Sequence, residues 1–241
     1  MRVWRSLSSV AAVVAYAGLA ACVAGEGASQ VVERGTAESG GPLIASSSPA
    51  PDPGPLLVAL GDSLTAGLGL DPDQAYPALL ERRLRAEGSD LTVVNAGVSG
   101  DTTAAGLRRV EWSLEGDVRI LIVALGGNDG LRGLPVDQMK RNLAEIVSLA
   151  RSRGIAVLLA GMEAPPNFGA TYTAQFRRVF HELASEHDVA FMPFLLAGVA
   201  GDPALNQADG IHPTAAGAAI VAEHVRAALA PLLPALTPAT Q

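Results

Sequence analysis

The chain has 241 residues, of which 49% are hydrophobic and 17% charged, and its formal net charge at pH 7 is −7. This length suits one ordinary domain that can bury a sizeable core. The acidic balance argues against a nucleic-acid-binding protein, which would need a basic face.

The first residues are typical of a secretory signal. Arg2 and Arg5 precede an uncharged apolar stretch from Val10 to Gly25, which is shorter than the roughly 20 residues of a membrane-spanning helix. Within it, Leu19-Ala20-Ala21-Cys22 resembles the lipobox of bacterial lipoproteins, whose cysteine becomes the lipidated first residue. Cys22 is the only cysteine, so no disulfide can form within the chain.

We therefore expect a lipoprotein signal peptide over residues 1–21 and an extracytoplasmic protein held at a membrane through Cys22. The alternatives are an uncleaved signal anchor, or cleavage elsewhere that leaves Cys22 incidental. Residues 22–54 are rich in Ala, Gly, Ser and Pro, which predicts a disordered linker after the lipidated cysteine. A folded domain is expected over 55–233, followed by a disordered tail over 234–241.

Within that domain, short apolar runs alternate with segments of helical periodicity. In chain order the sequence predicts a strand over 56–60, a helix over 76–86, a strand over 91–97, a helix over 102–114, a strand over 119–125, a helix over 136–154, a strand over 155–161, a helix over 173–187, a strand over 189–194 and a helix over 214–233. This alternation favours an α/β fold with a parallel sheet covered by helices on both faces. Ligands of such sheets bind beyond the carboxyl ends of the strands.

Four segments that follow predicted strands carry small residues and isolated polar side chains. They are GDSL (61–64), NAGVSGDTT (95–103), GGNDGLRG (126–133) and QADGIHP (207–213). A hydrolytic site needs a nucleophile, a base, a group that orients the base and donors for an oxyanion. The candidates are Ser63 as the nucleophile, His212 as the base and Asp209 as the group that orients it. The pair Gly100 and Asn128 are the candidate donors for the oxyanion.

Each of these residues also has a simpler interpretation. Ser63 could cap the helix after the first strand, and Asp209 could form an Asx turn. His212 could be a surface histidine, Asn128 could bond its own loop, and Gly100 could supply a left-handed turn. We favour the hydrolytic interpretation because the simpler ones require several coincidences at one edge of the sheet. Asp71 and Asp73 have no partners at the spacing of a metal site, and we interpret them as a turn and a helix start.

These motifs are also where the chain resembles a known family. GDSLTAG, NAGVSGDTT, ALGGNDGLRG, APPNFG and DGIHP occur in family order across residues 55–233, which closely resembles the GDSL, or SGNH, hydrolases. Within that family the chain is similar to the branch of bacterial arylesterases and thioesterase/lysophospholipases. The resemblance implies a three-layer α/β/α sandwich with a five-stranded, flavodoxin-like parallel sheet, and no metal or organic cofactor.

The resemblance also implies roles for the candidate residues. Ser63 would be the nucleophile, His212 the base and Asp209 its orienting carboxylate, while the N–H groups of Ser63 and Gly100 and the Asn128 amide would form the oxyanion hole. In the segment 161–169, the candidates for substrate contact are Met162, Pro166 and Phe168.

The expected function is hydrolysis of aryl or acyl carboxylic esters, with lysophospholipids or acyl thioesters as further substrates. The expected partners are therefore a small-molecule or lipid ester and, through the anchor, a membrane. Two alternatives stay open at this point, a carbohydrate O-deacetylase of the same family and a binding lipoprotein without catalysis.

Overall fold

The computed structural model describes residues 54–233, so the predicted signal, Cys22, nearly all of the linker and the tail lie outside the described part. Five strands form one sheet: β1 (Leu56–Gly61), β2 (Thr92–Gly97), β3 (Val118–Ala124), β4 (Ala156–Ala160) and β5 (Ala190–Met192). All pairings are parallel, in the order β2-β1-β3-β4-β5. The predicted five-stranded parallel sheet is confirmed.

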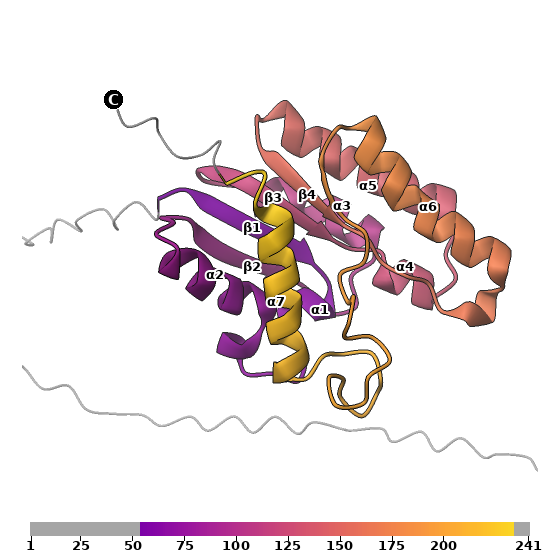
Figure 1. Ribbon diagram of the computed structural model, residues 1–241. Helices are drawn as coiled ribbons and strands as arrows, with labels where there is room; N and C mark the ends of the chain where they lie inside the picture. The colour runs from indigo at the N-terminus through magenta and orange to yellow at the C-terminus, as the bar shows by residue number, and fades with distance from the viewer. Residues whose placement is uncertain (1–53, 234–241) are drawn as a thin grey trace, which may run out of the picture. The chain divides into compact units, whose positions relative to one another are not determined.

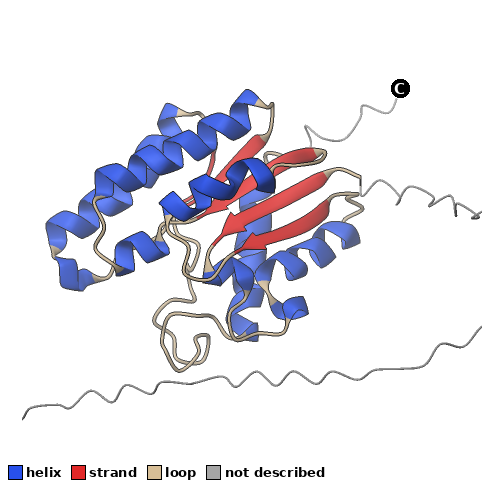
Figure 2. Cartoon of the chain, turned by 180° about the vertical axis from the view of Figure 1, so that it is seen from behind, coloured by secondary structure: helices blue, strands red, loops and turns tan. Residues whose placement is uncertain are grey.

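Five long helices make the outer layers. On one face α2 (Tyr76–Ala86) packs against α7 (Ala215–Leu229), and on the other α5 (Val136–Ser152) packs against both α3 (Thr103–Ser113) and α6 (Ala170–Glu186). Figure 1 shows α7 in front of the strands, and Figure 2 shows it behind them from the opposite side. The three-layer α/β/α arrangement is therefore the one predicted.

The sheet forms the centre of the core because its middle strands are apolar along their length. In β3, the four residues Ile120–Val123 are fully buried, as expected for a strand covered by helices on both faces. β2 is an edge strand, and none of its residues is buried. No helix in residues 54–233 is both long and apolar enough to span a bilayer.

The differences from the predicted elements lie mostly at the carboxyl edge of the sheet. Two short helices that the sequence did not predict follow strands there, α1 (Ser63–Ala66) and α4 (Gly127–Leu131). Two 3₁₀ turns, η1 (Pro72–Gln74) and η2 (Pro166–Phe168), were also not predicted, and α6 starts at Ala170 rather than 173. The long loop between β5 and α7 reaches the same edge as α1 and α4 (Figure 1).

Candidate active site

The serine of the GDSL segment opens the one-turn helix α1, and the residue before it caps that helix. Asp62 Oδ1 accepts a hydrogen bond from the Leu64 N–H at 3.1 Å, so Asp62 is the N-cap. Gly67 ends the turn with a positive φ of 77°. The interpretation of Ser63 as the capping residue is therefore wrong, and the serine hydroxyl is free to bond elsewhere.

The Ser63 hydroxyl bonds to a histidine 149 positions along the chain. Ser63 Oγ lies 2.8 Å from His212 Nε2, and His212 Nδ1 lies 2.6 Å from Asp209 Oδ2. The imidazole is thus held between a hydroxyl and a carboxylate, with its side chain only 15% exposed. A carboxylate on Nδ1 keeps the proton there, which leaves Nε2 to accept the serine proton.

Asp209 is an Asx-turn residue as well as the partner of the histidine. Its Oδ1 accepts from the backbone N–H groups of Ile211 at 2.9 Å and His212 at 3.0 Å. The bond from the His212 N–H lowers the pKa of the Asp209 carboxyl the most, and the imidazole and the Ile211 N–H lower it further. The pKa of this carboxyl is therefore well below its usual range. The turn therefore keeps this carboxylate ionised and aims its second oxygen at the imidazole.

A glutamine that the sequence analysis did not single out fastens the histidine loop to the serine turn. Gln207 Nε2 donates to the carbonyls of Leu68, at 2.7 Å, and Pro213, at 2.9 Å. Its backbone N–H donates to the carbonyl of His212 at 2.7 Å. Gln207 lies in the predicted QADGIHP segment, but nothing in that segment indicates a partner near position 68.

Three candidate donors face the same space as the Ser63 hydroxyl. The N–H groups of Ser63 and Gly100 make no hydrogen bond within the described residues, and Gly100 has a positive φ of 85°. Gly100 therefore does supply a left-handed turn, and the turn leaves its N–H unpaired. Asn128 does not bond its own loop, because its Nδ2 donates to Asp62 Oδ2 at 3.3 Å.

The capping aspartate thus touches both the serine helix and the asparagine. Asp62 is only 3% exposed, and burial raises the pKa of its carboxyl to about 6, while its bonds from Leu64 and Asn128 oppose the rise. The next aspartate, Asp129, accepts from the N–H and hydroxyl of Thr103 at 2.8 and 2.6 Å. It braces the start of α3 against α4.

Four of the candidate residues line one cavity of about 530 Å³, to which the loops after several strands contribute, while Asp209 lies outside its lining. Ser63, Gly100, Asn128 and His212 line it, and most of its other walls are apolar, including Leu68, Leu131, Met162, Pro166, Phe194, Leu196 and Ile211. Two of the three predicted contact residues, Met162 and Pro166, are therefore in the cavity. Phe168 does not line the cavity; it lies against Gly133, and its ring packs on that of Tyr172 at a tilted angle of 49°.

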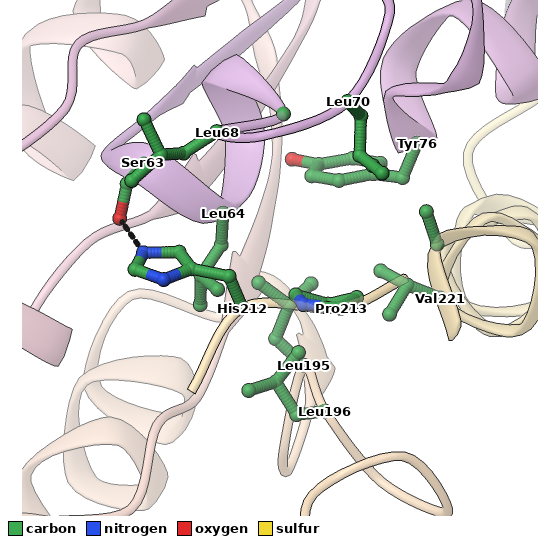
Figure 3. A pocket seen from close by; sticks show the side chains of 12 residues that line it. Ser63, Leu64, Leu68, Leu70, Tyr76, Leu195, Leu196, His212, Pro213 and Val221 are labelled. Carbon is green, nitrogen blue, oxygen red and sulfur yellow. Dashed lines mark hydrogen bonds between the residues drawn. The ribbon is translucent and has the colours of Figure 1, made fainter. Parts of the chain in front are cut away.

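A second, narrow space adjoins the histidine (Figure 3). It has room for about 10 Å³, roughly one water molecule, and its walls include Leu195, Pro213 and Val221. Figure 3 shows the Ser63 hydroxyl and the imidazole joined at its margin, with Tyr76 and Val221 farther off.

The arrangement suits acyl transfer to a serine hydroxyl. A nucleophile, a base and an oriented carboxylate lie in a row, with N–H donors beside an apolar cavity. Across residues 54–233, His, Cys, Asp and Glu form no group of three that could hold a metal ion.

The comparisons with known proteins identify the family. Residues 59–220 match the model of the GDSL-like Lipase/Acylhydrolase family, and the chain belongs to this family of hydrolytic enzymes. The resemblance seen in the motifs is therefore confirmed, apart from the lipoprotein signal, on which these comparisons do not bear.

Two curated relatives and one solved structure show how far the similarity extends. The chain is 46% identical to Esterase TesA of Pseudomonas aeruginosa over 178 residues, covering 73% of this chain and 89% of that protein. It is 37% identical over 178 residues to the Escherichia coli protein named thioesterase 1/protease 1/lysophospholipase L1, covering 73% and 84%. The solved crystal structure of TesA, 46% identical, has a TM-score of 0.71 and covers 74% of this chain and 99% of that chain.

Proposed function

We propose that the chain is a serine esterase that hydrolyses carboxylic esters through Ser63, His212 and Asp209. The observation that carries the proposal is the row of bonds from Ser63 Oγ to His212 Nε2, at 2.8 Å, and from His212 Nδ1 to Asp209 Oδ2, at 2.6 Å. This row opens into a largely apolar cavity, which suits the acyl or aryl part of an ester.

In the first half of the reaction, His212 Nε2 takes the hydroxyl proton as Ser63 Oγ bonds to the ester carbonyl carbon. The carbonyl electron pair moves onto oxygen, and this oxyanion accepts hydrogen bonds from the Ser63 and Gly100 N–H groups and from Asn128 Nδ2. Collapse of the intermediate breaks the bond to the alcohol oxygen, which takes the proton from Nε2. General base catalysis of this kind is worth roughly 10²–10⁴-fold.

In the second half, water gives a proton to His212 Nε2 and attacks the acyl group on Ser63. The second oxyanion occupies the same donors, and its collapse releases the carboxylic acid and returns the proton to the serine oxygen. Asp209 stays ionised throughout and stabilises the imidazolium that forms in each half.

The walls of the cavity favour apolar acyl or aryl groups. The side chains of Leu131, Met162 and Ile211 offer no hydrogen-bond donor, which argues against a polysaccharide as the preferred substrate. The names of the relatives, an esterase and a thioesterase/lysophospholipase, support acyl esters and, as further substrates, lysophospholipids or acyl thioesters. Anchoring through Cys22 and an extracytoplasmic location stay predictions from the sequence.

The test compares two serines of the same cavity, Ser63 and Ser99. Residues 25–241 are suitable because the TesA structure, which matches this domain over 99% of its length, shows that such a domain folds alone. With p-nitrophenyl esters of increasing acyl length, Ser63→Ala should lower kcat by about 10⁴-fold or more and abolish labelling by a fluorophosphonate. Ser99→Ala should keep both the turnover and the labelling by the fluorophosphonate. Turnover by Ser63→Ala close to that of the unchanged domain would refute the assignment.

A further inference from the structure

We propose that Arg109, on α3, is a positioning residue that fixes the Gly100 N–H relative to the Ser63 N–H. The inference rests on the proposed function, in which these two groups hold the oxyanion. Arg109 does not line the cavity and touches no reacting group, so it acts only through other residues.

The Arg109 guanidinium uses all three of its nitrogens on three separate partners. Nε donates to Asp101 Oδ2 at 2.7 Å, Nη1 to the carbonyl of Ala96 at 2.8 Å and Nη2 to the carbonyl of Gly61 at 2.8 Å. The Arg109 and Asp101 side chains are only 17% and 14% exposed. The partners come from the ends of β1 and β2 and from the loop that follows β2, so one planar group joins three segments.

The bond to Gly61 fixes the chain just before the nucleophile. Gly61 is the last residue of β1 and stands two positions before Ser63. Its carbonyl also accepts from the Val98 N–H at 3.0 Å, so it has one donor from α3 and one from the loop after β2. The peptide planes that lead into the Ser63 N–H therefore have little freedom to rotate.

The bond from Arg109 to Asp101 fixes the chain next to the second donor, the Gly100 N–H. Asp101 follows Gly100 directly, and its N–H donates to the carbonyl of Val98 at 3.1 Å, which closes a tight turn. The Gly100 carbonyl accepts from Arg132 Nη2 at 2.9 Å. Arg132 thus holds the Gly100 carbonyl and Arg109 holds the side chain of the next residue, both on the carboxyl side of Gly100, while the Gly100 N–H itself has no partner among the described residues. This leaves it free for an oxyanion.

Lysine cannot replace this arginine in the proposed role. A guanidinium directs its donors in a fixed plane toward acceptors that lie apart, whereas an ammonium is a compact point charge on a flexible stem. Arg109→Lys keeps the charge and most of the apolar stem but gives up the three-way link. Arg108 provides the matched control, because it neighbours Arg109 on the same helix and, within residues 54–233, its guanidinium bonds only to the Ala104 carbonyl of that helix.

The experiment measures kcat and KM for p-nitrophenyl butyrate and inhibition by an alkylboronic acid, whose tetrahedral adduct on serine mimics the oxyanion. Arg109→Lys should lower kcat by about 10–100-fold, in line with the loss of about 10² for a misplacement of 1 Å. KM should change little, and the boronic acid should bind more weakly by a similar factor. Arg108→Lys should leave all three values unchanged.

Rates are calculated per active molecule, from fluorophosphonate titration, so that a smaller folded fraction does not imitate the effect. The proposal is overturned if kcat per active molecule stays within about twofold, or if KM rises while boronic acid affinity is kept. If Arg109→Lys does not fold, Asp101→Asn applies the same test to the Gly100 side of the link. If the unchanged domain shows no turnover that depends on Ser63, the proposed function itself is refuted. The failure of the proposed function and the failure of the role of Arg109 are therefore distinguishable.

Discussion

Replacing Asp62 by asparagine is expected to change how the unfolding free energy of the domain varies with pH. The Asp62 carboxyl lies between the Leu64 N–H, which it caps, and the Asn128 amide, and it is only 3% exposed. Burial raises its pKa from 3.8 to about 6. Asparagine is nearly the same size and still offers one oxygen to the Leu64 N–H, but it does not titrate.

The size and sign of the effect follow from this pKa difference. A pKa that is higher in the folded state means that ionisation is less favourable there than in the unfolded chain. The contribution of Asp62 to stability is therefore fully present below pH 3.8 and is lost as the pH rises to about 6. A shift of about two units corresponds to about 3 kcal/mol. The difference in unfolding free energy, unchanged domain minus Asp62→Asn, should fall by about that amount between pH 3.5 and 7, a window that spans both pKa values.

The assay is urea unfolding of residues 25–241, followed by far-UV circular dichroism at several pH values across this window. Because groups other than Asp62 titrate in the same window, only the difference between the two proteins is interpreted. Asp71→Asn is the control, since Asp71 is exposed and its side chain makes no capping bond. A difference between the unchanged domain and Asp62→Asn that stays constant, or grows, with rising pH would refute the account of the buried carboxyl.

Two further predictions concern the oxyanion donors and the packing behind the serine. Asn128→Ala should lower kcat by about 10²–10³-fold with little change in KM, because the oxyanion exists only in the transition state, and steady-state kinetics with an ester substrate would measure this. A rise in KM of the same size, with kcat unchanged, would contradict the role of Asn128 as an oxyanion donor. Gly97→Ala would place a Cβ 2.2 Å from the Ala66 nitrogen, in the turn that holds Ser63, and should destabilise the domain by about 1–3 kcal/mol. Thermal unfolding would measure this effect, and an unchanged midpoint would contradict it.

The elements that the sequence predicted well are those whose pattern repeats. The helix expected over 76–86 has those same bounds in the structure, and the apolar run at 119–125 forms the buried strand β3. The helices α1 and α4 were missed because four or five residues are too few to show a period of 3.6. These two short helices carry Ser63 and Asn128, so the elements hardest to predict hold two of the candidate catalytic groups.

The candidate residues could be found from the sequence because parallel strands end at one edge of the sheet. That rule placed Ser63 near His212 across 149 positions, and the structure gives them a hydrogen bond of 2.8 Å. It could not identify Arg109 or Gln207 as supporting residues. Their contacts depend on the direction of single side chains toward backbone carbonyls or amides of distant segments, and no spacing in the sequence records such directions.

The GDSL turn illustrates why a local pattern and the site it serves can favour different residues. Serine and aspartate are both good N-caps, and two candidates stand side by side at the start of α1. If Ser63 capped the helix, its hydroxyl would be occupied by a backbone N–H. With Asp62 as the cap, the hydroxyl bonds to His212 instead, and the carboxylate reaches Asn128 as well. This arrangement buries a carboxyl whose raised pKa lowers stability at neutral pH, so the turn gives up stability to keep the serine free.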